Sequence, residues 1–187
     1  MITGCFESFA DITQNCLRHA LAEYRVEISK DSLRGLMTAY DSLSAFPDVK
    51  PTLEQLASTP NITTVVFSNG TEAMVSNSVH RSADLSPNAN VFYDIITVDS
   101  VAEYKPAPAA YAHLAKRMGK YPSKMNELWL ISGNPFDIIG AKNMGMNAIW
   151  IDRKDGGWVD ACLPHLRPTA IVNNLEQIVE VLNSHGH

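Results

Sequence analysis

Residues 128–153, LWLISGNPFDIIGAKNMGMNAIWIDR, decide the fold expected for this chain. The stretch begins with a short apolar run that stops at residues 132–135 (SGNP), and it closes with a second apolar run at residues 148–151. Between the two runs, apolar residues recur at helical spacing with small residues among them. This order predicts a strand, a tight turn, a helix and a second strand, which form a βαβ unit with both strands buried in a parallel sheet.

The turn after the first of these strands carries polar side chains that suit either a ligand site or a helix cap. Ligands of parallel sheets bind at the carboxyl ends of the strands, where Ser132, Asn134 and Asp137 are expected to lie. Asn134 and Asp137 are also residue types that cap a helix and complement its dipole. The turn alone leaves both interpretations open.

The rest of the chain predicts an α/β core that carries a helical cap. Strand and helix patterns alternate from residue 61 onward, which is typical of a parallel sheet covered by helices. The expected strands are 62–67 and 93–98, and the expected helices are 72–81, 108–118 and 175–182. Helices are also expected at 6–21, at 32–43 and, capped by Thr52, at 52–58. A proline-marked connection at 45–51 divides a cap (1–46) from a core domain (47–187).

Composition and charge narrow the class of protein. The formal net charge of -5 gives no basic footprint, so we expect no nucleic-acid partner. No apolar run approaches the length of a membrane span, and the start of the chain lacks a signal region. The 3 cysteines are scattered, which favours reduced thiols over disulfides or a zinc site. We therefore expect a cytoplasmic enzyme-like protein without a cofactor, whose exposed helical hairpin could support a homodimer.

Two further segments have the chemistry of an anion site. Ser68-Asn69-Gly70-Thr71 follows an expected strand and offers side-chain and backbone donors to a carboxylate or phosphate, although Asn-Gly is also a common turn dipeptide. Lys105 precedes a proline, which favours extended backbone from which the lysine can point inward. A buried ammonium needs a carboxylate partner or an anionic ligand. The alternative is an ordinary solvated lysine.

The three segments in this order resemble the motifs of the haloacid dehalogenase superfamily, and most closely those of the type II (S)-2-haloacid dehalogenases. The resemblance covers residues 6–153 and rests on Ser68-Asn69-Gly70, on Tyr104-Lys105-Pro106, and on Ser132, Asn134 and Asp137. It implies a Rossmann-like parallel sheet with a partial helical cap. It also implies catalytic roles for Lys105, Ser132, Asn134 and Asp137, and substrate contacts for Phe6, Ser68, Asn69 and Tyr111.

One residue favours dehalogenases over the phosphatases of the same superfamily. Those phosphatases hold Mg²⁺ with two acids spaced four residues apart, and here the position four residues before Asp137 is Gly133. Because Mg²⁺ prefers carboxylate oxygens, this departure indicates a site without metal. A phosphatase, and a catalytically dead remnant that acts as a binding module, stay open as alternatives.

The resemblance also implies an element that the sequence lacks. The family's nucleophile is an aspartate at the end of the first strand, in an Asp-x-x-Gly-Thr setting, and it forms an ester with a short 2-haloalkanoate. None of the aspartates of this chain stands in that setting. We therefore expect that the chain begins inside the cap and that the nucleophile strand is missing. We also expect that the chain alone is unstable or aggregation-prone, and inactive.

Overall fold

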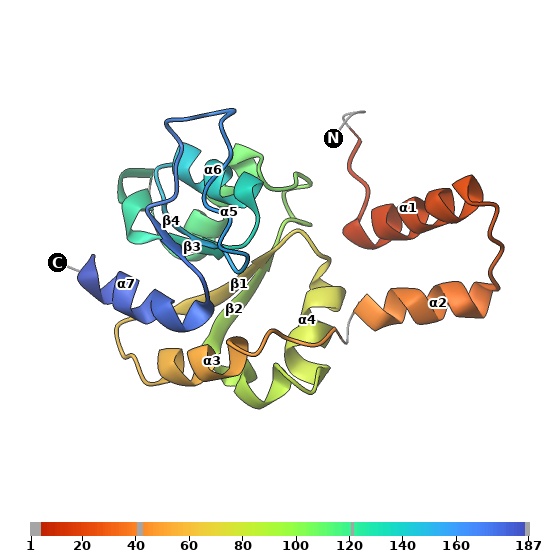
Figure 1. The fold of residues 1–187 in the computed structure, drawn as a ribbon, viewed down its shortest axis with the longest axis horizontal. Helices are drawn as coiled ribbons and strands as arrows, with labels where there is room; N and C mark the ends of the chain where they lie inside the picture. Colours follow the sequence, from red (N-terminus) through yellow and green to blue (C-terminus); the bar gives the residue numbers. More distant parts are fainter. Residues whose placement is uncertain (1–4, 41–42, 121, 186–187) are drawn as a thin grey trace. The chain divides into compact units, whose positions relative to one another are not determined.

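The computed structural model of the chain describes residues 5–40, 43–120 and 122–185 (Figure 1). The chain divides into two compact units. The first unit comprises Met1–Phe46 with Thr63–Ala102, and the second comprises Pro47–Ile62 with Glu103–His187. One crossing between the units, at Phe46 and Pro47, lies in the proline-marked connection. The assignment of residues 1–46 to a cap and 47–187 to a core stays a prediction.

The first unit contains a helical hairpin and a two-stranded parallel sheet. Its elements are α1 (Phe9–Glu23), α2 (Lys30–Ala39), β1 (Thr64–Ser68), α4 (Glu72–Arg81), η2 (Ser86–Val91) and β2 (Phe92–Thr97). The Ser8, Ser29 and Thr71 side chains accept hydrogen bonds from backbone N–H groups in the first turns of α1, α2 and α4. Strand β1 pairs in parallel with β2, and α4 packs against β2.

The second unit contains the βαβ arrangement predicted from residues 128–151. Its elements are α3 (Val49–Ala57), α5 (Pro108–Arg117), η3 (Pro122–Glu127), β3 (Trp129–Ser132), α6 (Pro135–Asn143), β4 (Asn147–Ile151), β5 (Ala170–Val172), η4 (Leu175–Gln177) and α7 (Ile178–Ser184). Strands β3, β4 and β5 form one parallel sheet in that order. Helix α6 connects β3 to β4 and packs on both strands, which places its N-terminus beside the carboxyl end of β3.

The α/β fold class is confirmed, and three details differ from expectation. The helix expected at 52–58 begins at Val49, and Thr52 lies inside it and donates its hydroxyl to the Asp48 carbonyl at 2.6 Å. Strand β5 was not predicted because its three residues are too few to show a period. The final helix starts as the 3₁₀ turn η4 before α7. The described strands form two separate sheets, and the absence of the nucleophile strand stays a prediction.

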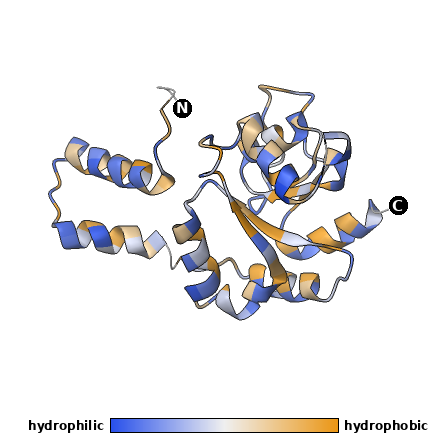
Figure 2. Cartoon of the chain, turned by 180° about the vertical axis from the view of Figure 1, so that it is seen from behind, coloured by the Kyte–Doolittle hydropathy of each residue, from blue (hydrophilic) through white to orange (hydrophobic). Residues whose placement is uncertain are grey.

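The hairpin of α1 and α2 leaves large hydrophobic side chains exposed, among them Tyr24, Val26 and Leu36. Helix α1 contains no buried residue, and α2 buries only Leu33. Both helices mix hydrophobic and hydrophilic residues along their length (Figure 2). No helix in the described part of the chain combines the length and the hydropathy that crossing a bilayer requires.

Candidate active site

The turn between β3 and α6 is held by the Ser132 hydroxyl. Ser132 Oγ accepts a hydrogen bond from the Asn134 backbone N–H at 3.0 Å and donates one to Asp137 Oδ2 at 2.9 Å. Asn134 occupies the N-cap position of α6, but its side chain makes no capping hydrogen bond and the residue is exposed. The capping interpretation of this turn therefore does not describe Asn134, and the Asp137 carboxylate is directed toward Ser132.

Lys105 and Asp137 form a buried ion pair. Lys105 Nζ lies 3.4 Å from Asp137 Oδ1 and 3.5 Å from Oδ2, and the two side chains are only 8% and 6% exposed. Of the two alternatives that the sequence left open for Lys105, this geometry agrees with a buried lysine that has a carboxylate partner and not with a solvated one. Burial lowers the pKa of the Lys105 ammonium, and the charge of Asp137 opposes that change. A cation held in so dry a place can stabilise a further negative charge strongly.

Tyr111 fixes the first turn of α6 from beneath. The tyrosine is fully buried, and its hydroxyl donates to the Asp137 backbone carbonyl at 3.1 Å. A Cβ on Gly140 would lie 2.2 Å from Tyr111 Oη, so only glycine allows α6 to approach this ring. Burial raises the pKa of the Tyr111 phenol, and the negative charge of Asp137 raises it further. The phenol therefore stays protonated and donates its hydrogen bond. A contact between Tyr111 and a substrate stays a prediction.

The other three predicted site residues belong to the first unit. Ser68 ends β1 and its hydroxyl accepts a hydrogen bond from the Gly70 N–H at 2.9 Å, with Asn69 between them. Phe6 precedes α1. All three are half-buried. The structure thus brings Lys105, Tyr111, Ser132, Asn134 and Asp137 together in the second unit, and the roles of Phe6, Ser68 and Asn69 stay predictions.

A second buried acid anchors the segment that leads into α3. Asp48 accepts hydrogen bonds from Arg153 Nη2 at 2.9 and 2.8 Å and from the Leu175 N–H at 2.8 Å. Burial raises the pKa of the Asp48 carboxyl, but these donors outweigh burial and the net shift is downward. Sequence reasoning missed this cluster because Asp48 is separated from its two partners by more than 100 residues along the chain.

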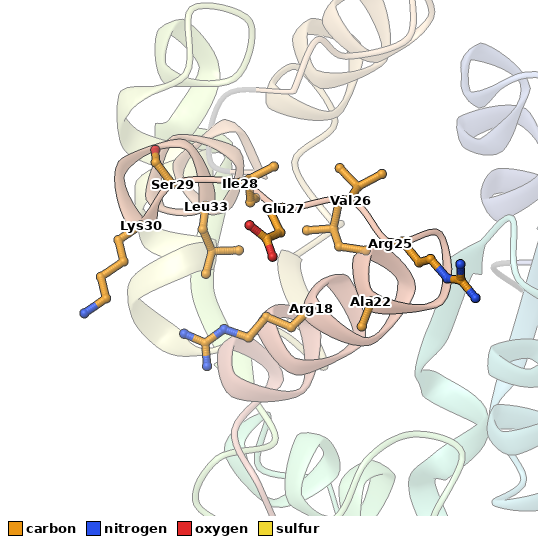
Figure 3. Close-up of a pocket in the computed structure, with 10 residues that line it drawn as sticks. Arg18, Ala22, Arg25, Val26, Glu27, Ile28, Ser29, Lys30 and Leu33 are labelled. Atoms are coloured by element: carbon orange, nitrogen blue, oxygen red, sulfur yellow. The ribbon is translucent and has the colours of Figure 1, made fainter.

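A cavity of about 480 Å³ lies in the α1–α2 hairpin, and its lining includes none of the predicted site residues that the structure describes. Arg18, Glu27 and Leu33 are among the residues that line it. Figure 3 shows that Arg25 and Lys30 extend outward on opposite sides of this cavity. In the described ranges, no group of three His, Cys, Asp or Glu side chains could hold a metal ion.

The sequence of this chain is similar to those of known dehalogenases. The (S)-2-haloacid dehalogenase 4A of Burkholderia cepacia is 33% identical over 149 residues, which cover 80% of this chain and 61% of that protein. The (S)-2-haloacid dehalogenase 1 of Pseudomonas sp. (strain CBS-3) is 32% identical over 152 residues, which cover 81% of this chain and 63% of that protein. The chain therefore spans about three fifths of the length of these curated relatives.

A solved structure and a family model extend the match. The crystal structure of the L-2-haloacid dehalogenase RSc1362 superposes with a TM-score of 0.83 at 28% sequence identity, covering 95% of this chain and 74% of that one. The model of the haloacid dehalogenase-like hydrolases matches residues 3–145, which is most of the chain. This chain therefore belongs to the haloacid dehalogenase-like hydrolases.

Proposed function

We propose that this chain supplies the lysine and aspartate part of a dehalogenase site that converts short 2-haloalkanoates into 2-hydroxyalkanoates. The buried pair of Lys105 and Asp137 at the carboxyl end of β3 carries this proposal. A desolvated ammonium beside a carboxylate is suited to hold a second, attacking carboxylate ionised. The names of the relatives, which are (S)-2-haloacid dehalogenases, support the same substrate class.

The proposed reaction has two balanced steps. The attacking carboxylate forms an ester bond to C2 of the substrate, and the carbon–halogen bond breaks to release halide. Water then attacks the carboxyl carbon of the ester, which releases the 2-hydroxy acid, a proton and the regenerated carboxylate. Lys105 keeps the attacking carboxylate ionised, and Asn134 and Asp137 position and activate the water.

The remaining predicted residues bind the substrate or support the pair. The Ser132 hydroxyl holds the Asp137 carboxylate that faces Lys105. Ser68 and Asn69 bind the substrate carboxylate, while Phe6 and Tyr111 shape the pocket around its short alkyl chain. These assignments extend the motif resemblance.

We propose that the attacking acid comes from polypeptide outside the 187 residues, because no aspartate among them ends an apolar strand before Gly-Thr. A second candidate function is a binding module without catalysis, which is favoured by the same observation that no aspartate among the 187 residues stands in the nucleophile setting.

Recovery of the neighbouring coding sequence, followed by a halide-release assay, separates these functions. We expect an in-frame Asp-x-x-Gly-Thr strand upstream, and we expect the extended protein to release chloride from 2-chloropropionate while the 187-residue chain releases none. The control is the extended protein with Lys105→Met, which should lose activity about a hundredfold. An upstream region without such a strand would favour the binding module. Magnesium-dependent phosphate release from small phosphomonoesters, without halide release, would instead establish a phosphatase.

A further inference from the structure

The indole of Trp150 reaches the turn that carries the candidate catalytic residues. Trp150 lies in β4, directly opposite Ser132 in the parallel register. Its Nε1–H donates a hydrogen bond to the Gly133 backbone carbonyl at 3.3 Å. Nothing in the sequence motifs indicates this contact, because the two residues are separated by a helix.

This hydrogen bond is the first link of a chain that ends at Lys105. The Gly133 carbonyl and the Asn134 N–H belong to one planar peptide group, so fixing one end fixes the other. The Asn134 N–H donates to Ser132 Oγ at 3.0 Å, and Ser132 Oγ donates to Asp137 Oδ2 at 2.9 Å. Asp137 in turn faces the Lys105 ammonium. Successive hydrogen bonds of this kind polarise and strengthen one another.

The Trp150 ring is itself held in place by a neighbouring loop. Trp158 meets it edge to face, with ring centroids 5.1 Å apart and an interplanar angle of 81°. The loop before Trp158 is closed by the buried Asp152 carboxylate, which accepts from the Gly156 and Gly157 N–H groups at 3.2 and 2.7 Å. Among the described residues, the buried Trp158 Nε1 has no hydrogen-bond partner. The two indoles therefore share one ring contact, but only Trp150 donates to the catalytic turn.

We infer that Trp150 is a positioning residue of the proposed dehalogenase site: its indole N–H orients the Gly133–Asn134 peptide and, through Ser132, the Asp137 carboxylate that faces Lys105. The inference rests on the proposed function for its catalytic meaning, while the hydrogen-bond chain itself can be tested without turnover.

Two matched substitutions test it, because Trp150→Phe and Trp158→Phe each replace one indole of the same ring pair. Trp150→Phe removes the N–H that donates to Gly133, whereas Trp158→Phe removes an N–H that has no acceptor in the described part of the chain. Amide hydrogen exchange of Asn134 is measured in the extended protein, because the 187 residues alone are expected to be unstable. We expect about fivefold faster exchange in Trp150→Phe, the factor for loss of one neutral hydrogen bond, and no change in Trp158→Phe. Equal acceleration in both variants, or none in either, would overturn the inference.

Isosteric replacement keeps the test decisive if Trp150→Phe fails to fold. Benzothienyl-alanine at position 150 preserves the shape of the indole but replaces the N–H by sulfur, and it should give the same acceleration. In the extended, halide-releasing protein, loss of the Trp150 N–H should lower kcat about fivefold and leave KM unchanged, while Trp158→Phe changes neither. An unchanged kcat would show that the turn does not need this hydrogen bond. If the unsubstituted extended protein releases no halide, the proposed function fails, and the exchange comparison still decides the hydrogen-bond chain.

Discussion

Replacement of Gly140 by alanine tests whether α6 is held against Tyr111 as tightly as the structure indicates. The new Cβ would lie 2.2 Å from Tyr111 Oη, 2.5 Å from Cζ and 2.7 Å from Cε2. Optimal contacts between non-bonded carbon atoms are about 3.5–4.0 Å, so the overlap with the ring carbons is close to an ångström. Tyr111 is fully buried, and therefore the ring cannot swing into solvent to relieve it.

The expected cost combines three terms. Overpacking in a closed core lowers the free energy of unfolding by up to about 3 kcal/mol. We use this upper value because the new Cβ meets a ring that is fully buried. Displacing the ring breaks its hydrogen bond to the Asp137 carbonyl, which costs about 1 kcal/mol. Alanine in a helix interior regains about 1 kcal/mol over glycine. Gly140→Ala should therefore lower the free energy of unfolding by about 3 kcal/mol.

Urea denaturation of the extended protein measures this loss, and two controls isolate its cause. At Gly35, in α2, no atom of the described residues lies within 4 Å of the place that a Cβ would take, so Gly35→Ala should stabilise by up to about 1 kcal/mol. In a Tyr111→Ala background the clash disappears, and Gly140→Ala should then be neutral or stabilising. A Gly140→Ala midpoint equal to that of the unsubstituted chain would refute the close packing of α6 on Tyr111.

Three further substitutions address the buried charges and the metal argument. The lowered pKa of Asp48 means that this carboxylate stabilises the fold above about pH 4 and that its contribution is lost as the pH falls through the folded-state pKa. Asp48→Asn should lower the free energy of unfolding by about 2 kcal/mol at pH 7. Urea denaturation at about pH 3 should show a smaller difference between the variant and the unsubstituted protein. The same difference at both pH values would contradict the pairing of Asp48 with Arg153. Lys105→Met should lower the free energy of unfolding by about 3 kcal/mol, because it leaves the Asp137 carboxylate buried without its cationic partner. Adding Asp137→Asn should restore part of that free energy, and urea denaturation of the single and double variants measures both changes. A double variant no more stable than Lys105→Met would contradict the ion pair. Gly133→Asp should create Mg²⁺ binding that calorimetry detects, because it adds a carboxylate four residues before Asp137. The new side chain has room, since a Cβ at Gly133 would meet only the Ile151 carbonyl, at 3.7 Å, among the described residues. Absence of Mg²⁺ binding in this variant would contradict the argument that Gly133 is what favours a site without metal.

The local pattern of residues was sufficient for the family and for most elements of the fold, although not for the short strand β5. The βαβ unit follows from two apolar runs separated by a turn signal and a helical period, all of which are short-range properties. Helix α4 has the bounds expected from Thr71 as its cap and from the apolar period that follows. The motifs indicated a haloacid dehalogenase-like hydrolase, and the family model confirms that family.

The contacts that build the candidate site were decided only by the tertiary structure. The sequence left open whether Lys105 is solvated or buried beside a carboxylate or an anionic ligand, and Asp137 becomes its partner because packing brings a loop and a helix start together. The sequence could not show that the buried Tyr111 ring packs against Gly140, and only folding reveals why that residue must be glycine. Trp150 was expected only as a strand residue until the parallel register placed it opposite Ser132. Periodicity records which face of an element is buried, whereas the identity of the neighbour across that face depends on how distant segments pack.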